Sequence, residues 1–208
     1  MSVVEQPSRT RRRKAARPGE IVAAGIEEFA EHGFERARLD RIAAKAGIAK
    51  GTIYLYFPSK EALFLAAVEE HVISVMAENE LTLQTFEGST EDLLRVSLKS
   101  AYAKMLSPEN QAVMRILISE SHRLPDMAQT YHDMAIKRGS ALLAGLVERG
   151  IARGELRESA ATQTPELLIA PIMFACLHNM TFQHIDPLDI DEYFEGHIEM
   201  IMRGIGKV

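Results

Sequence analysis

The sequence contains very little cysteine and no long apolar run, and these two shortages exclude several classes of protein. Cys176 is the one cysteine among 208 residues, so no disulfide can form within the chain. No apolar stretch reaches the ~18 residues that a membrane-spanning helix needs. The first twenty residues are polar and basic and lack the apolar region of a signal peptide. We therefore expect a protein of the reducing cytoplasm that does not enter a membrane.

Motifs that mark common enzymes and metal sites are also missing. The sequence has no H-E-x-x-H zinc helix, no G-x-S-x-G nucleophile turn and no Gly-rich phosphate loop. Asp186, Asp189 and Asp191 lack the glycine and the terminal glutamate of a calcium loop, and helix capping explains them better. We expect no catalytic residue, no metal and no cofactor, and an all-α enzyme remains the less favoured alternative.

Charge is distributed unevenly along the chain. Residues 1–60 hold 12 Lys and Arg against 7 Asp and Glu, whereas the whole chain has a net charge of −5. A basic N-terminal part on an acidic body is typical of a protein whose N-terminal part meets a polyanion. Many of the positive residues gather between Arg9 and Lys14, which is also compatible with a solvated tail. We expect residues 1–16 to form a basic disordered tail.

The remaining sequence has the pattern of an all-α protein. No stretch alternates with the period of a strand, and no Asn-Gly or Asp-Gly hairpin turn occurs. Capping residues, glycines and prolines divide the chain into about nine helices. We expect helices at about 18–32, 39–46, 50–57, 59–84 and 125–150, and further helices beginning near residues 90, 107, 164 and 189.

Two of the expected helices are too short to be stable alone. The helices over 39–46 and 50–57 have about eight residues each and are joined by a turn at Gly47. They must pack on the apolar stripe of the helix over 18–32. A helix-turn-helix supported by a third helix is a common way to present one helix to the major groove of DNA. We therefore predict a DNA-binding domain over residues 17–62.

The helix over 50–57 has a polar face that suits DNA. Ile53 and Phe57, four residues apart, can face the core. Gly51 is costly inside a helix, by roughly 1 kcal/mol relative to Ala, and is explained if another backbone must come close. Hydroxyl groups can donate to phosphates, and a cation near a helix start can pair with one. The expected contacts on this face are Lys50, Gly51, Thr52, Tyr54, Tyr56 and Lys60.

Residues 21–63 resemble the DNA-binding domain of the TetR family of repressors, over about a fifth of the chain. The resemblance implies that Lys50, Gly51 and Thr52 reach bases and nearby phosphates, and that Tyr54, Tyr56 and Lys60 contact phosphates. The elements that carry it are Phe29, Gly33-Phe34, Ile42-Ala43, Ala46-Gly47-Ile48, Lys50-Gly51-Thr52-Ile53-Tyr54, Tyr56-Phe57 and Ser59-Lys60-Glu61-Ala62-Leu63.

The sequence departs from the pattern of the family at two positions. Arg38 stands where the family usually has Thr or Ser at the start of the second helix. An arginine has no acceptor with which to cap a helix, although its charge can still bind a phosphate, and we keep it as an expected DNA contact. Ala49 replaces a residue that commonly carries a hydroxyl. A ligand-binding dimer that has lost DNA binding therefore remains an alternative.

The resemblance also implies a ligand-binding and dimerisation domain over residues 63–208. The expected eighth helix is apolar almost all round, and the ninth carries Phe194, His197, Ile198, Ile201 and Ile205 on one face. In the family, these two helices pair with their copies across a two-fold axis to make a homodimer. A buried core within a monomer is the alternative. We expect Pro171 to kink the eighth helix.

By the same resemblance, a small-molecule effector binds among helices four to eight and releases the repressor from operator DNA. Methionines provide deformable lining for an apolar or amphipathic molecule. Each candidate taken alone is more often an ordinary core residue. The residues expected to line the pocket are Met76, Tyr102, Met105, Met114, Ile118, Phe174 and His178.

Overall fold

The computed structural model describes residues 9–207, with side chains described for 18–70 and 79–207. Over this part of the chain every regular element is helical, and one isolated bridge joins Leu156 to Gly206. The all-α prediction is confirmed. The elements are α1 (Arg9–Arg36), α2 (Leu39–Lys45), α3 (Lys50–Ile53), α4 (Lys60–Thr85), α5 (Thr90–Met105), α6 (Pro108–Glu120), α7 (Pro125–Tyr131), the π-helical turn η1 (His132–Ile136), α8 (Lys137–Ala152), the 3-10 turn η2 (Pro165–Leu168), α9 (Ala170–Phe182) and α10 (Ile190–Ile205).

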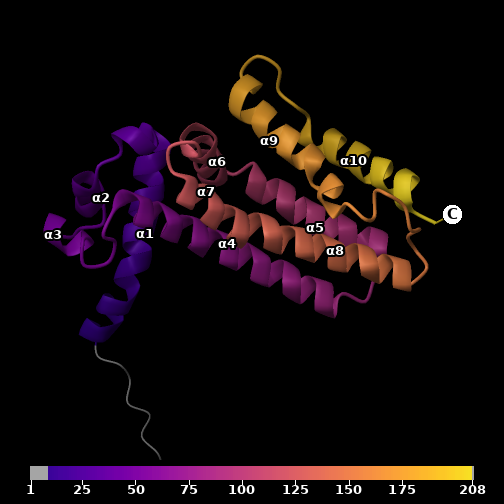
Figure 1. Cartoon of the computed structure of the whole chain (residues 1–208), viewed down its shortest axis with the longest axis horizontal. Helices are drawn as coiled ribbons and strands as arrows, with labels where there is room; N and C mark the ends of the chain where they lie inside the picture. Colours follow the sequence, from indigo (N-terminus) through magenta and orange to yellow (C-terminus); the bar gives the residue numbers. More distant parts are fainter. Residues whose placement is uncertain (1–8, 208) are drawn as a thin grey trace, which may run out of the picture.

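The helices form a small head and a longer body. Figure 1 shows α1, α2 and α3 gathered at one end, from which α4 runs along the body beside α8. The helices α9 and α10 lie along the opposite side of the body and pack on α5. Because α4 starts at the head and runs along the body, it belongs to both parts. None of the described helices is long and apolar enough to cross a membrane.

Side-chain caps begin four of the helices, as the sequence indicates. Ser59, Ser107 and Asp189 accept backbone N–H groups of Ala62, Asn110 and Glu192, respectively. The helix expected near residue 90 begins at Thr90, and Ser89 is its cap. Short polar side chains at these positions satisfy amides that the first helical turn leaves free, and the helix starts are therefore legible in the sequence.

The first helix is longer than expected and changes direction near its end. It begins at Arg9, so residues 9–16 are helical and not the irregular tail predicted for 1–16, while residues 1–8 lie outside the described part. Arginine, lysine and alanine, which fill residues 11–17, are strong helix formers and extend a helix that has already begun. At Gly33 the backbone leaves the helical region with φ 71° and ψ 171°.

Three other helices differ from the prediction. The helix α3 ends at Ile53 and continues as turns through Tyr56, and the proline at position 58 disfavours a helical conformation at Phe57, so the helical run does not extend further. Residues 125–152 form one run in which η1 interrupts the α-helical pattern. Pro171 lies in the first turn of α9, after η2, where a proline starts a helix and does not kink it.

The head and body share a hydrophobic core. The rings of Phe29, Phe34 and Phe64 contact one another with centroids 5.7 to 5.8 Å apart, which joins α1 to α4. The same cluster includes Ile42 of α2 and Ile53 of α3, both fully buried, and extends into α6. The two short helices are therefore held by this shared core. A second cluster fills the body between α5, α8, α9 and α10.

The glycines of the head predict opposite responses to substitution. Because Gly33 has a positive φ with an extended ψ, Gly33→Ala should destabilise the protein by about 1–3 kcal/mol. Gly51 is helical and an added Cβ meets nothing within 4 Å, so Gly51→Ala should leave stability unchanged or raise it by up to about 1 kcal/mol. Urea unfolding of both variants checks the prediction, and equal losses in the two would contradict it.

Candidate nucleic-acid interface and effector pocket

The residues expected to meet DNA lie at the end of the head formed by α2, α3 and the start of α4. Lys50 and Gly51, in the first turn of α3, are exposed, and the side chain of Thr52 is half-buried. Tyr54 follows α3 and is also exposed. Tyr56 is different because its ring packs against the core. The four residues Lys50, Gly51, Thr52 and Tyr54 thus form an accessible polar surface around α3.

One exposed residue of this region was not anticipated. Leu55 is 82% exposed, the largest exposure given for any apolar side chain of the described residues. It lies between Tyr54 and Tyr56, in the turn after α3. A leucine is normally predicted to be buried, so nothing in the sequence indicated that Leu55 would be exposed. An exposed apolar side chain here can contact the sugars or thymine methyl groups of a bound duplex.

Arg38 and Lys60 are engaged within the head. The guanidinium of Arg38 donates to both carboxylate oxygens of Asp40, at 3.0 and 2.8 Å, and this lowers the pKa of the Asp40 carboxyl. The ammonium of Lys60 donates to the carbonyl oxygens of Glu35 and Ala37, at 3.1 and 3.5 Å. It also lies 4.6 Å from the centre of the Phe34 ring. Lys60 therefore caps the carboxyl end of α1.

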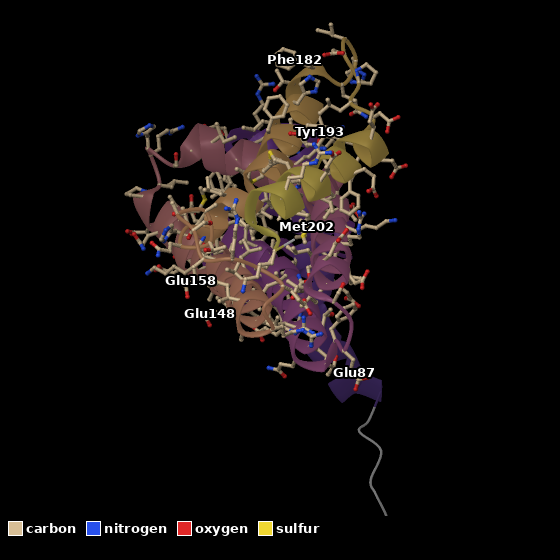
Figure 2. The ribbon with its side chains drawn as sticks, turned by 90° about the vertical axis from the view of Figure 1, so that its right-hand side faces the viewer. Glu87, Glu148, Glu158, Phe182, Tyr193 and Met202 are labelled. Atoms are coloured by element: carbon tan, nitrogen blue, oxygen red, sulfur yellow. The ribbon has the colours of Figure 1, made fainter. Side chains whose placement is uncertain are left out.

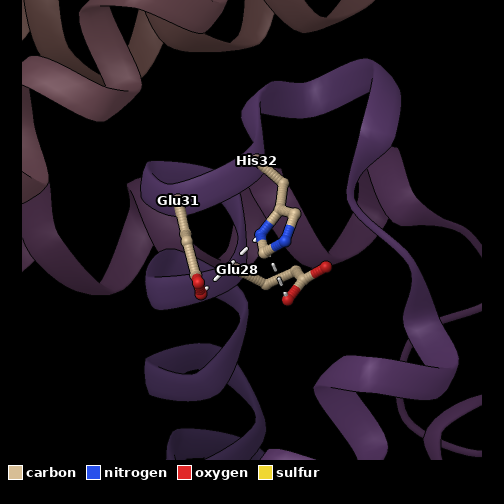
Figure 3. A group of neighbouring side chains, drawn as sticks. All are labelled: Glu28, Glu31 and His32. Carbon is tan, nitrogen blue, oxygen red and sulfur yellow. Dashed lines mark ion pairs between the residues drawn. The ribbon is translucent and has the colours of Figure 1, made fainter.

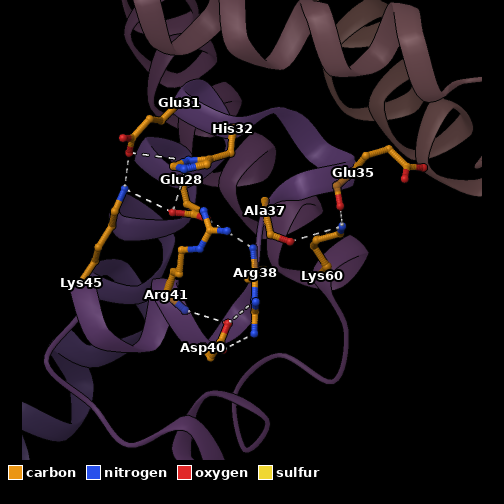
Figure 4. A network of polar contacts seen from close by, with 10 residues as sticks. All are labelled: Glu28, Glu31, His32, Glu35, Ala37, Arg38, Asp40, Arg41, Lys45 and Lys60. Carbon is orange, nitrogen blue, oxygen red and sulfur yellow. Dashed lines mark hydrogen bonds and ion pairs between the residues drawn. The ribbon is translucent and has the colours of Figure 1, made fainter.

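A buried carboxylate joins α1 to α2 beneath this surface. Glu28 of α1 is fully buried, and its Oε1 accepts the backbone N–H of Arg38 at 3.4 Å (Figure 4). Arg41 approaches the same oxygen to 3.3 Å, and Lys45 approaches Oε2 to 3.4 Å. The sequence analysis did not identify Glu28. Its position next to Phe29, in the apolar stripe of α1, was the only indication in the sequence that this carboxylate is buried.

Near the end of α1, Glu28 lies beside Glu31 and His32, and all three side chains are of types that bind metals. Figure 3 shows Glu28, Glu31 and His32 close together, and His32 Nδ1 lies 3.7 Å from an oxygen of each carboxylate. The ammonium of Lys45 lies 2.9 Å from Glu31 Oε2 and 3.4 Å from Glu28 Oε2. Lys45 thus pairs with both carboxylates and Arg41 pairs with Glu28, so two positive groups of the chain balance the two negative ones, and we assign the cluster to an ion-pair network.

The residues expected to line an effector pocket fall into two groups. Met105 and Met114 pack in the core shared with the head, and Met105 also packs on the second cluster, in which Tyr102 is buried. Ring contacts through Tyr193 connect Tyr102 to Phe174, which in turn contacts His178. Ile118 is 56% exposed on α6 and Phe174 is 55% exposed on α9, so neither lines the interior. The side chain of Met76 lies outside the described part of the chain. Because effector pockets enclose most of their ligand, the buried members of the set are the ones that we carry forward as a prediction.

Sulfur atoms gather where α6 and α9 meet the shared core. Cys176 Sγ lies 3.8 Å from Met180 Sδ and donates to the Met105 carbonyl at 3.2 Å. Tyr131 donates to Met114 Sδ at 3.7 Å. Burial raises the pKa of the Cys176 thiol, and a buried thiol in apolar surroundings is unreactive. We call this group the sulfur cluster: Met105, Met114, Met127, Met173, Cys176 and Met180.

A buried polar pair lies in the second cluster. Tyr102 Oη and His197 Nδ1 are 3.2 Å apart, between α5 and α10. Burial raises the pKa of Tyr102 and lowers that of His197, so both groups are neutral near pH 7. A surface groove of about 520 Å³ lies close by between the same helices, and none of the expected ligand residues lines it. Tyr102 therefore serves the packing of α10 on α5.

The helices α9 and α10 present apolar side chains to the outside of the body (Figure 2). The exposed positions from η2 through α9 alternate in steps of three and four residues, which places them on one face. On α10 the buried face holds His197, Ile198, Ile201 and Ile205, and it packs within the chain. The exposed apolar residues are Leu167, Phe174, Leu177, Phe182, Ile185 and Met200.

That placement corrects the face expected for dimerisation. The ninth expected helix corresponds to α10, whose apolar stripe from Phe194 to Ile205 covers α5 of the same chain. The outward surface comes mainly from η2 and α9. The sequence could not show whether the apolar stripe of α10 faces a second subunit or α5 of the same chain, because both α9 and α10 carry more apolar side chains than one buried face requires.

Two family profiles match most of the chain. Residues 21–67 match the family described as bacterial regulatory proteins, tetR family, and residues 87–195 match the tetracyclin repressor-like C-terminal domain. The second match alone covers more than half of the 208 residues. The chain therefore belongs to the TetR family. It is a DNA-binding transcriptional regulator and not an enzyme, and members of this family bind operator DNA as dimers.

Individual relatives agree with this assignment. The fatty acid metabolism regulator protein of Bacillus subtilis is 26% identical over 139 residues, which is 67% of this chain and 70% of the relative. A putative TetR-family regulator from Mesorhizobium loti superposes with a TM-score of 0.80 at 20% identity, over 94% of this chain and 99% of the other. The regulator FadR from Bacillus subtilis, solved with stearoyl-CoA, gives a TM-score of 0.73 at 21% identity, over 89% and 98%.

The contacts of Lys50, which is exposed, and of Lys60, which is half-buried, predict different effects. Lys60→Ala removes a charged donor from two carbonyls and should lower stability by about 1 kcal/mol, a value reduced for partial exposure. Lys50→Ala should leave stability unchanged but lower the slope of log K against log salt for DNA binding by about 0.9 if Lys50 meets one phosphate. Thermal unfolding and salt titrations separate the two. A stability loss in Lys50→Ala would contradict the assignment.

Proposed function

We propose that this TetR-family regulator is a repressor that reads operator DNA with the surface around α3. The observation that carries the proposal is the exposed set Lys50, Gly51 and Tyr54 at the end of the head, inside the matched segment 21–67. Thr52 completes this surface. The first turn of α3 enters the major groove, and Tyr56, Lys60 and Arg38 stand at its edge near phosphates. Since it acts on DNA, we place the protein in the cytoplasm.

The effector that we propose is a small apolar or amphipathic molecule bound in the body. The sulfur cluster supports this choice, because thioether side chains are unbranched and can repack around an inserted chain. The cluster is formed by residues of α5, α6, α7 and α9 and belongs to the core that the body shares with the head. A structural neighbour was solved with stearoyl-CoA. A long acyl chain is therefore the first effector class to test.

Effector and operator are proposed to be linked through α4. This helix has 26 residues and so spans roughly 39 Å, from the head to the far end of the body. A small tilt at one end moves the other by ångströms, and two recognition helices must meet major grooves about 34–36 Å apart. A second link supports the idea, because Arg123 after α6 pairs with Glu35 at the end of α1 and approaches Glu120 to 3.5 Å.

The repressor mechanism predicts that effector and DNA weaken each other's binding. With a duplex from upstream of its own gene, saturating DNA should reduce the affinity for stearoyl-CoA by about 5- to 150-fold, since coupling is reciprocal and typically ~1–3 kcal/mol. Isothermal titration with and without the duplex checks this. Met114→Lys, inside the sulfur cluster, should abolish acyl binding, whereas the exposed Ile118→Lys is the matched control.

Four outcomes of this experiment would count against parts of the proposal. Equal acyl-CoA affinities with and without DNA would exclude induction by this route. Tighter binding with DNA would make the molecule a corepressor. Binding of stearoyl-CoA by neither protein nor complex would reject the acyl class, and absence of DNA binding would favour a dimer that has lost this activity. A selection from random duplexes, made with the free protein, distinguishes that last case from a wrong choice of DNA.

The dimer is proposed to form through the outward faces of α9 and α10. Leu177 and Phe174 are exposed and centrally placed on α9. The small residues Gly196 and Gly204 of α10 have open space around them, which allows a second helix to come close. The two-fold axis would then pair these helices with their copies.

Charge on this face should separate the subunits without unfolding them. Leu177→Glu is expected to give a monomer at micromolar concentration and to weaken operator binding at least about tenfold, because a charge buried in an interface is costly. Sedimentation velocity measures the mass. The control is Val96→Glu, which places the same charge at an exposed apolar position on α5. A dimeric Leu177→Glu protein would assign the interface elsewhere.

A further inference from the structure

The second helix of the head begins without the cap that its sequence position requires. Arg38 is the residue before the first turn of α2, and its side chain makes no capping hydrogen bond. In a capping box the third helical residue is a glutamate or glutamine that accepts the N–H of the cap residue. Here that third residue is Arg41, which has donors only. Within α2, Asp40 accepts the backbone N–H of Arg41 at 3.1 Å, but no side chain of this helix accepts the N–H of Arg38, which is the half of the box that the third residue normally supplies.

A residue of another helix occupies the missing position. Glu28 of α1 accepts the backbone N–H of Arg38, as a glutamate of a capping box would, although it comes from ten residues earlier in the chain. The donor at the third position, Arg41, approaches the same carboxylate oxygen to 3.3 Å. One turn further along α2, Lys45 reaches the other oxygen. The carboxylate therefore contacts the beginning, middle and end of α2.

We propose that Glu28 is a positioning residue for DNA binding, which completes the cap of α2 from α1 and fixes α2 and α3 against the head. The inference rests on the proposed DNA-reading role of this surface. A negative charge at the start of α2 is also favourable for the helix dipole. Because Glu28 is fully buried, its charge is costly without partners, and Arg41 and Lys45 supply them.

The position of the contact explains why it matters for DNA. The helix α2 has seven residues, too few to be stable by itself, and α3 follows it after a four-residue turn. Any fraying at Arg38 moves the start of α2, and α3 packs on α2. Arg38 is also an expected phosphate contact. A single buried carboxylate is thereby linked to the orientation of the whole reading surface.

The test uses the full-length dimer and hydrogen exchange of the α2 amides. Glu28→Ala should raise their exchange rates at least about tenfold, as expected from the loss of a hydrogen bond to a charged group, while amides of α5 keep their rates. Arg38→Ser adds a hydroxyl that can accept the N–H of Arg41 in the same turn, so the double variant should recover part of the protection. Arg38→Ser alone should change the rates less than about threefold, because Asp40 and Glu28 already accept the N–H groups of Arg41 and Arg38 in the wild type.

Two further variants keep the test decisive. Glu28→Gln retains an acceptor of the same shape, which guards against loss of the fold, and should raise exchange in α2 less than Glu28→Ala does. Glu31→Gln is the matched control, since Glu31 also pairs with Lys45 but lies exposed and makes no contact with Arg38. It should leave α2 unchanged. If exchange rises equally throughout the protein, or if Arg38→Ser gives no recovery, Glu28 has only a general structural role and the proposal is wrong.

DNA binding is read separately, so that the two proposals fail in different ways. With a duplex from upstream of its own gene, Glu28→Ala at a temperature well below unfolding should bind at least about tenfold more weakly than wild type. Selective loss of α2 protection with unchanged affinity would keep the capping role but overturn the role in DNA binding. Wild-type protein that binds no duplex from a random-sequence selection would overturn the proposed function itself, while the exchange data would still judge the cap.

Discussion

The burial of three phenylalanine rings between α1 and α4 is the interaction on which the rest of this structure depends. Phe29, Phe34 and Phe64 lie against one another, with the edges of some rings toward the faces of others. Residues of α2 and α3 insert into the same cluster. Neither short helix could persist without it. Since Phe64 belongs to the long helix α4, the surface around α3 is connected to the body by packing.

Charged side chains fix the positions of the head helices more closely than the apolar core does. Apolar contacts bring α2 to α1 but do not set where along α1 it begins. The Glu28 carboxylate does so, because hydrogen bonds and ion pairs are directional and hold Arg38 and Arg41 at particular atoms. Lys60 does the same at the carboxyl end of α1 by donating to two carbonyls. The head thus combines a non-directional core with a few directed polar contacts.

In the body, the apolar pattern of the sequence does not show which role a residue has. Its apolar residues are numerous enough for an internal core, an effector site and a dimer face, and the same residue types serve all three. The stripe of α10 was expected at the dimer face but covers α5, and the outward surface comes mainly from η2 and α9. The sulfur cluster also forms from four helices, α5, α6, α7 and the more distant α9. Only Met173, Cys176 and Met180 could have been grouped beforehand, by their helical spacing.

The sequence by itself determined the helical class, the starts of the capped helices and the motif of the DNA-binding head. These features depend on neighbours in the chain, since a cap such as Ser59 acts within three residues. Tertiary structure alone decided that Glu28 would cap α2, that Lys60 would close α1, and that Ile118 would face outward. Each of these depends on which distant segments are brought together, and burial in a shared core gives a polar side chain partners that its own segment does not contain.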